Sequence, residues 1–190
     1  MYKCLLVLLS VVGMTTATFA QQKQDMNSNL SNHKILVAYF SATGTTARAA
    51  ENVAAATGGE LYAIIPTQPY TDADLDWNDK QSRSSVEMND PKSRPALGGK
   101  RLDVSAYDVV FIGYPIWWDL APRVINTFIE NHDLKGKTVV PFATSGSSSI
   151  ANSAATLRRT YPALDWKEGR LLNRADEKTV RTWIEQSVFL

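Results

Sequence analysis

Hydroxyl-bearing side chains gather in one short loop near the start of the chain. The loop follows an apolar run at 35–40 and consists of Ser41, Ala42, Thr43, Gly44, Thr45 and Thr46. The apolar run does not alternate with polar residues, which is typical of a strand buried on both faces of a parallel sheet. The alanine-rich segment 47–57 predicts a helix after the loop, and the first amides and positive dipole end of a helix favour an anion.

This loop can hold a phosphate, and it suits a permanently bound phosphate monoester. It has no Lys and therefore is not a Walker-type P-loop, which requires G-x-x-x-x-G-K-[ST]. The alternative is that its Ser and Thr residues only cap the helix, as these residue types often do. The loop by itself does not decide between the two interpretations.

Two further strands are predicted to run into loops that bear candidate binding residues. An apolar run at 109–113 leads into Tyr114 and then Pro115, Ile116, Trp117 and Trp118, and a second run at 139–143 leads into Thr144, Ser145, Gly146 and Ser147. In an open α/β sheet the loops after the strands share one edge, and ligands bind there. We therefore expect a phosphate cradle, an aromatic loop and a hydroxyl- and amide-rich loop to meet at one crevice.

The three motifs, in this order, resemble the flavodoxin-like family, in particular bacterial flavodoxins with G-Y-P-I-W-W and T-S-G loops. The resemblance extends from about Lys34 to the C-terminus. It implies that FMN is the cofactor, with its phosphate at Ser41 to Thr46. Pro115 to Trp118 would flank the isoalloxazine ring, and Thr144 to Ser147 would face its pyrimidine side. Relatives tend to carry more glycine in this last loop, where this chain has Ser145, Gly146 and Ser147.

The alternation of strands and helices predicts an α/β fold with a doubly wound, five-stranded parallel sheet of order 2-1-3-4-5. Besides the three strands above, strands are expected at 61–65 and, weakly, at 166–172. Later helices are expected from Pro122, over about 149–160, and at the end of the chain. The final helix has one apolar stripe, formed by Val180, Trp183, Ile184 and Val188.

The segment 67–101 has no strong apolar period and is longer than the usual connection, so it is either functional or loosely ordered. A helix is possible over 74–88. Arg83 and Glu87, four residues apart, predict a structural ion pair on that helix. Tyr70 and Trp77 are expected to pack into the core, with covering the flavin as the alternative.

The N-terminal residues differ in composition from the rest of the chain. Residues 1–20 have one charge, a short apolar core and a small-residue end, which predict a secretory signal peptide. A membrane anchor is the alternative. Residues 21–33 are expected to be a polar leader, and 34–190 the flavodoxin-like domain. We expect a periplasmic or secreted protein with no stable membrane insertion after cleavage, or a cytoplasmic one if translation starts at Met26.

Composition and histidine placement exclude several functions. Cys4 is the only cysteine, and without Lys3 the chain has 19 basic and 19 acidic residues, so neither thiol chemistry nor nucleic-acid binding is expected. No metal-ligand cluster is visible. A serine hydrolase would need a base, but His33 and His132 are predicted at the opposite edge of the sheet, and no G-x-S-x-G elbow is present.

The sequence thus predicts an FMN-binding, flavodoxin-like redox protein that transfers electrons through a noncovalent flavin, with no catalytic side chain assigned. Its partner would be a redox protein or a small acceptor such as a quinone. The alternatives are an NAD(P)H-dependent FMN reductase of quinone-like acceptors and a non-redox module that binds a phosphorylated ligand. The three loops contain no Lys or Arg, Asp119 adjoins the second, and Arg123 is expected to face solvent.

Overall fold

The computed structural model describes residues 32–188. The predicted signal peptide, Met26 and nearly all of the polar leader lie outside this part of the chain. None of the helices within 32–188 is long and apolar enough to cross a membrane.

The centre of the molecule is a parallel β-sheet. Its strands are β1 (Ile35–Tyr39), β2 (Glu60–Ala63), β3 (Val109–Pro115), β4 (Thr138–Thr144), β5 (Asp165–Trp166) and β6 (Arg170–Leu171). The order is β2-β1-β3-β4-β5, with β6 also paired to β4, and every pair is parallel. The predicted fold class and strand order are confirmed.

The fifth strand differs from the single run predicted over 166–172, because it is split into β5 and β6. Val139 and Ala143 of β4 accept hydrogen bonds from Lys167 and Leu172 at 2.9 and 2.8 Å. Pro141 lies between them on the same strand and has no N–H to donate. The fifth strand passes this position as a loop, and a Cβ on Gly169 would come within 2.7 Å of the Pro141 carbonyl oxygen.

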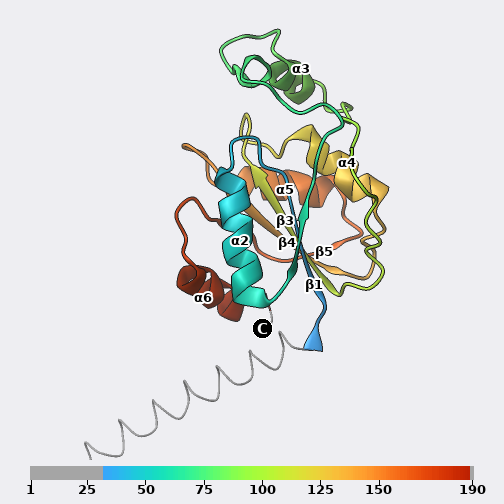
Figure 1. Cartoon of the computed structure of the whole chain (residues 1–190), viewed down its shortest axis with the longest axis vertical. Coiled ribbons are helices and arrows are strands. Elements are labelled where there is room, and N and C mark those ends of the chain that lie inside the picture. The colour runs from blue at the N-terminus through green and yellow to red at the C-terminus, as the bar shows by residue number, and fades with distance from the viewer. Residues whose placement is uncertain (1–31, 189–190) are drawn as a thin grey trace, which may run out of the picture.

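Helices cover both faces of the sheet (Figure 1). Alternate residues of the buried strands face opposite layers. One face packs against α2 (Thr45–Thr57) and α6 (Glu177–Ser187), the other against α4 (Arg123–Asn131) and α5 (Ala151–Thr160). In β1, Val37 faces α2 and α6, while Leu36 and Ala38 face the other layer. The apolar stripe predicted for the last helix is buried in the first of these layers.

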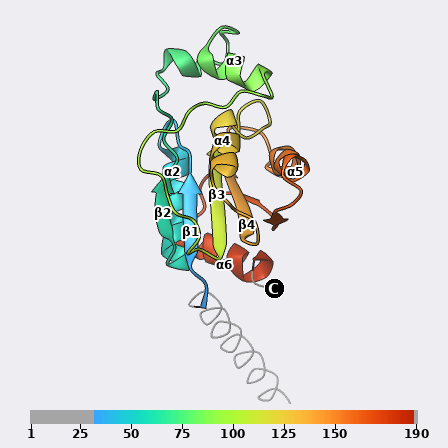
Figure 2. The ribbon, with the colours of Figure 1, turned by 90° about the vertical axis from the view of Figure 1, so that its right-hand side faces the viewer.

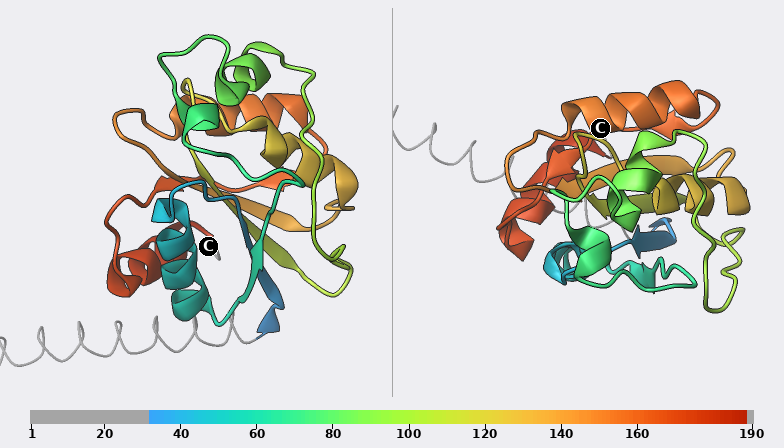
Figure 3. Two further views of the ribbon diagram at one scale, coloured as in Figure 1. Left: turned by 45° about the horizontal axis from the view of Figure 1, so that its top comes forward. Right: turned by 90° about the horizontal axis from the view of Figure 1, so that it is seen from above.

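The insertion at 67–101 projects beyond the carboxyl edge of the sheet, where the strand-following loops lie (Figures 2 and 3). It contains a short 3₁₀ helix, η1 (Ala73–Leu75), and α3 (Arg83–Asn89) in place of the one helix considered over 74–88. Its two arms are joined where Thr67 donates to the carbonyl of Ala96 at 2.8 Å. The insertion therefore stands next to the edge at which the sequence places the binding loops.

Candidate functional site

The first loop presents the start of α2 without a side-chain cap. Gly44 is the residue before the helix, and its φ of 86° is in the left-handed region that favours glycine. Glycine has no side chain with which to cap the first turn, and no cap hydrogen bond is made from this position. The first amides of α2 are therefore left to other partners, and an anion is one that suits them.

The loop hydroxyls have different roles. Ser41 Oγ accepts a hydrogen bond from the Gly44 amide at 3.1 Å, which closes the loop on itself. The hydroxyls of Thr46 and Thr144 are buried and lie 2.8 Å apart, so this hydrogen bond joins the first loop to the third. Thr43 is exposed and lines the cavity described below. Among these hydroxyls, that of Thr43 is the one placed to meet a ligand directly.

The aromatic loop is a tight hairpin with a strained tip. Trp117 and Leu120 exchange backbone hydrogen bonds of 2.9 and 3.0 Å, and only two residues lie between them. Those two, Trp118 and Asp119, have φ values of 46° and 62°, the arrangement of a type I′ turn. Left-handed backbone costs a non-glycine residue about 1–2 kcal/mol, and such strain clusters at binding sites.

The two tryptophans of this loop have different surroundings. The ring of Trp117 is partly buried and packs edge-on against Phe40 and Tyr70, with centroid distances of 5.5 and 5.2 Å. Trp118 at the tip of the hairpin is 47% exposed. Trp117 is therefore a fixed wall of the site, whereas Trp118 offers a free aromatic surface to a ligand.

The third loop is held by a residue that the sequence analysis missed. Asn173 accepts from the Ser145 amide and donates to the Ser145 carbonyl, both at 2.7 Å, as a neighbouring strand would. Ser145 Oγ in turn accepts from the amides of Ser147 and Ser148 at 3.2 and 2.8 Å. Asn173 comes soon after the weak fifth strand, so the rule that loops after parallel strands share one edge could have found it.

The three loops meet at one cavity of about 670 Å³, a size common for cofactor and small-molecule sites. The predicted site residues that line it are Ala42, Thr43, Pro115, Ile116, Trp117, Trp118, Ser145, Gly146 and Ser147. The other predicted residues lie within the loops and outside the lining, namely Ser41, Gly44, Thr45, Thr46 and Thr144. The expected convergence at the carboxyl edge is thus present.

The insertion supplies one wall of this cavity through Leu75, Trp77 and Ser84. Tyr70 and Trp77 of the insertion were both predicted to pack into the core. The prediction is correct for Tyr70, which packs against the core, and wrong for Trp77. Trp77 is 72% exposed, because the short η1 helix has no buried residue and leaves its neighbours on the surface. The exposed indole of Trp77 therefore borders the same space as that of Trp118.

A partly buried cluster of Tyr70, Arg83 and Glu87 anchors the insertion behind this wall. The predicted ion pair between Arg83 and Glu87 is present, with Nε 2.6 Å from Oε1, and the Tyr70 hydroxyl donates to the same carboxylate. Burial, followed by the hydrogen bond to Glu87, raises the pKa of Tyr70, which keeps its hydroxyl protonated as a donor. Because Tyr70 also packs on Trp117, the insertion is coupled to the aromatic loop.

The prediction that Arg123 faces solvent is wrong. It is 8% exposed, and its guanidinium donates to the carbonyls of Glu87 and Met88 at 3.3 and 2.8 Å. These carbonyls end α3 and have no partner within the helix. Asp119 lines the cavity and no Lys or Arg does so within residues 32–188, so the local charge is negative.

The surfaces around the cavity fit a flat molecule with a terminal phosphate. Thr43 lines the cavity just before the start of α2, aromatic side chains line it from the second loop, and the loop held by Asn173 lines it from the third. Within the described residues no group of three or more His, Cys, Asp or Glu side chains is placed to hold a metal ion. His132 lies outside this cavity, so the serine side chains of the site have no imidazole base beside them.

Comparison with known proteins agrees with this fold. Two crystal structures of proposed flavoproteins are similar to the chain. One, from Bacteroides eggerthii, has 74% identity and a TM-score of 0.80, over 81% of this chain and 97% of its own. The other, from Bacteroides uniformis, has 62% identity and a TM-score of 0.79, over 80% of this chain and 98% of its own.

A more distant structure shares the fold alone. The flavoprotein of Lactobacillus acidophilus, solved in complex with FMN, has 22% identity and a TM-score of 0.64, over 80% of this chain and 98% of its own. No protein of curated function matches the chain significantly. The sequence profile of flavodoxins matches residues 34–187. Since that match extends over nearly all of the described domain, the chain belongs to the flavodoxin family.

Proposed function

We propose that this protein binds FMN noncovalently and transfers electrons through it. The observation that carries the proposal is the single cavity at which Thr43 of the loop before α2, the exposed Trp118 and the 145–148 loop meet. Each of the three loops supplies one of the contacts that FMN needs, namely a phosphate anchor, a flat apolar surface and polar backbone groups. When bound, the cofactor supplies the redox chemistry, and the protein positions it.

The residues divide this task between them. Thr43 and the first amides of α2 hold the phosphate, and Gly44 lets the backbone approach it closely. Trp118 stacks on the ring, with Pro115 restricting the loop. The Gly146 amide meets the polar edge, since the amides of Ser145, Ser147 and Ser148 already bond within the protein. Asp119 lines the cavity, and no Lys or Arg within residues 32–188 does so. The negative charge of a reduced flavin is therefore poorly stabilised, and we expect the bound flavin to be a strong reductant.

Ligand affinities test the binding part of this proposal. The fluorescence of FMN should be quenched when it binds to the purified protein. FMN should also bind more tightly than FAD or riboflavin, because the cradle suits a terminal phosphate monoester. Equal affinities for the three flavins would contradict a phosphate cradle. A protein that binds phosphorylated molecules but no flavin would instead be the non-redox binding module.

The electron donor is a separate question with its own measurement. The second candidate, an NAD(P)H-dependent reductase of quinone-like acceptors, remains open because the exposed indoles of Trp77 and Trp118 border one space, which suits a flat acceptor. Stopped-flow reduction of the FMN-loaded protein by NADH and NADPH distinguishes the two. Fast reduction supports the reductase, whereas reduction only by a partner protein supports the carrier.

We further infer that the protein works outside the cytoplasm, with FMN acquired there. The signal-like segment 1–20 lacks a twin Arg, so the chain would be exported unfolded and without cofactor. Free NAD(P)H is scarce in that compartment, which favours a protein donor. Cell fractionation tests the premise: a mature protein that begins near Gln21 in the periplasm supports export, and a cytoplasmic product that begins at Met26 contradicts it.

A further inference from the structure

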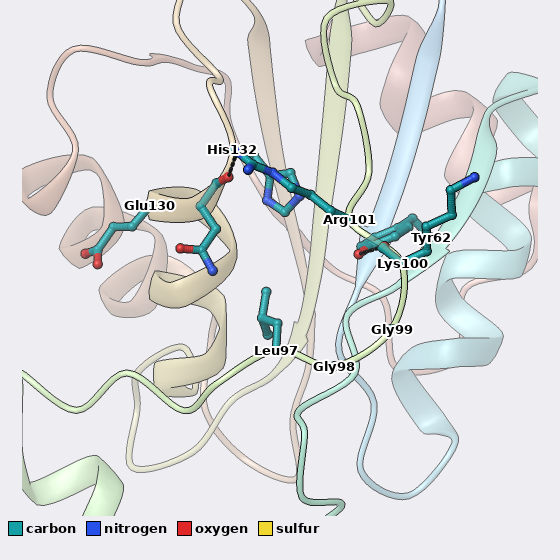
Figure 4. Close-up of a pocket in the computed structure, with 9 residues that line it drawn as sticks. Tyr62, Leu97, Gly98, Gly99, Lys100, Arg101, Glu130 and His132 are labelled. Atoms are coloured by element: carbon teal, nitrogen blue, oxygen red, sulfur yellow. Dashed lines mark hydrogen bonds between the residues drawn. The ribbon is translucent and has the colours of Figure 1, made fainter.

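A second cavity, of about 450 Å³, lies away from the three binding loops. It is formed between the end of α4 and the return arm of the insertion, and Tyr62 of β2 closes one side (Figure 4). The loop residues Gly98, Gly99, Lys100 and Arg101 border it opposite His132. None of its lining residues lines the cavity at the carboxyl edge.

His132 contributes a buried nitrogen without a partner to this cavity. Its Nδ1 lies 2.7 Å from the Phe128 carbonyl oxygen, which can only accept, so Nδ1 carries the hydrogen. In the neutral ring Nε2 is then an acceptor, and it has no hydrogen-bond partner among the described residues. The residue is only 9% exposed and packs between the rings of Phe128 and Tyr62. A buried polar atom left in this way is destabilising unless something bonds to it.

Two cations stand at the mouth of the cavity without a carboxylate partner. Arg101 reaches across toward His132, and its Nη2 makes a single 3.5 Å hydrogen bond to the Asn131 carbonyl (Figure 4). Lys100 is exposed and has no side-chain partner within residues 32–188. Glu130 also lines the cavity, but Arg94 and the Tyr161 hydroxyl bond its two oxygens at 2.8 and 2.7 Å. The positive charge of Lys100 and Arg101 is therefore available to a ligand.

We propose that this cavity is a second ligand site for a small organic anion that also carries a hydroxyl or N–H donor. The donor bonds to Nε2 of His132, and the anionic group pairs with Arg101 and Lys100. Nε2 is buried, so a donor reaches it only after a lining side chain moves, and Arg101 is held by a single 3.5 Å hydrogen bond to the Asn131 carbonyl. The anionic group can be a carboxylate or a phosphate ester, and neither requires FMN to be bound.

The imidazole signals of the protein report on this site directly. The chain has two histidines, so in proton–carbon NMR spectra His132 is the reporter and the exposed His33 is an internal control. Glycerate and glycerol 3-phosphate, titrated into FMN-saturated protein, distinguish carboxylate from phosphate. We expect at least one to shift His132 alone, saturating with a dissociation constant on the order of 1 mM.

Substitutions separate a built site from general charge attraction. Arg101→Ala should weaken the probe about 10-fold or more, because a hydrogen bond to a charged group is lost. Lys178→Ala removes an exposed cation of α6 that lines neither this cavity nor the adjoining one, and it should leave the affinity unchanged. His132→Gln keeps an acceptor and should bind more tightly than His132→Phe, by about 3- to 10-fold.

Several outcomes would overturn the proposal. They are the absence of a saturable His132 shift with both probes, an equal loss in Arg101→Ala and Lys178→Ala, or equal shifts at His33 and His132. If both His132 variants fail to fold, the comparison of Arg101→Ala with Lys178→Ala decides alone. FMN affinity, measured in the same samples, should not change in any of these variants.

Discussion

At the scale of single residues, Trp118 combines exposed aromatic surface with left-handed backbone. Its φ of 46° would suit glycine or asparagine, yet the position holds the largest side chain available. A residue that is strained and half exposed contributes little to folding, since it neither relaxes the turn nor fills the core. The strain is understandable if the indole is needed at the cavity, which suggests that stability and binding oppose one another here.

Two variants of Trp118 separate strain from ring contact. Without FMN, Trp118→Gly should unfold with a free energy about 1 kcal/mol higher than that of Trp118→Ala, because only glycine relaxes the turn. Both should bind FMN about 2- to 12-fold more weakly, as expected for loss of one aromatic contact. Chemical denaturation and flavin fluorescence provide the measurements. Equal stability of the two variants would show that the turn carries no strain.

Thr43 tests the phosphate cradle, because it is the exposed loop hydroxyl that lines the cavity. Thr43→Ala should weaken FMN about 10- to 100-fold and leave riboflavin unchanged, since riboflavin has no phosphate. Thr46→Ala should weaken FMN and riboflavin alike, because the buried Thr46 hydroxyl lies outside the cavity and joins the first and third loops through Thr144. Equal losses for both flavins in Thr43→Ala would show that this hydroxyl has only a structural role.

At the scale of elements, the short helix α3 depends on a residue of α4. The Arg123 guanidinium bonds the carbonyls of Glu87 and Met88, which a seven-residue helix cannot satisfy by itself. The Tyr70, Arg83 and Glu87 cluster then ties the same helix to Trp117. The wall that carries Trp77 is therefore placed by tertiary contacts and not by helix propensity.

Arg123→Met should loosen α3 while the sheet remains intact. We expect faster amide hydrogen exchange over 83–89 and a loss of about 1.5–3 kcal/mol of unfolding free energy, because buried hydrogen bonds to a charged group are removed. Arg159→Met is the matched control, since Arg159 is exposed on α5, and it should change stability by about 0.5 kcal/mol or less. Unchanged exchange in α3 would contradict this role of Arg123.

The split fifth strand makes a second prediction for an element. A Cβ at residue 169 would lie 2.7 Å from the Pro141 oxygen and 2.8 Å from its Cγ, so Gly169→Ala should destabilise the protein by about 1–3 kcal/mol. A Cβ on Gly146 meets no atom within 4 Å, which makes Gly146→Ala the control for stability. Thermal unfolding without FMN compares the two, and similar melting temperatures would refute a close approach at Gly169.

At the scale of the whole molecule, two buried layers make the domain stable without a ligand. Both faces of the sheet are covered by apolar residues, and the cavity lies at its edge, outside these layers. We therefore expect a cooperative unfolding transition in the apo protein. FMN at 100 times its dissociation constant should add about 2.7 kcal/mol, which raises the melting temperature by roughly 5–10 °C. Scanning calorimetry with and without FMN measures this, and a non-cooperative apo protein would contradict it.

The sequence by itself determined the sheet and the meeting of the three loops. Buried parallel strands are continuous apolar runs, and the ends of such strands share one edge, so residues distant in the chain could be placed together from local patterns. The same local reasoning identified the Arg83 and Glu87 pair, because four residues make one turn of a helix. Such features depend on spacing along the chain, which the sequence contains directly.

Only the tertiary structure decided what each loop residue contacts. Trp77 and Arg123 were misjudged because the exposure of a side chain depends on which element lies beside it. Asn173 holds the third loop through Ser145, which is 28 residues away in the chain. Nε2 of His132 has no hydrogen-bond partner among the described residues, and no local pattern predicts this. Sequence patterns report which face of an element is apolar, whereas hydrogen-bond partners, strain and cavities arise only when elements from distant segments are packed together.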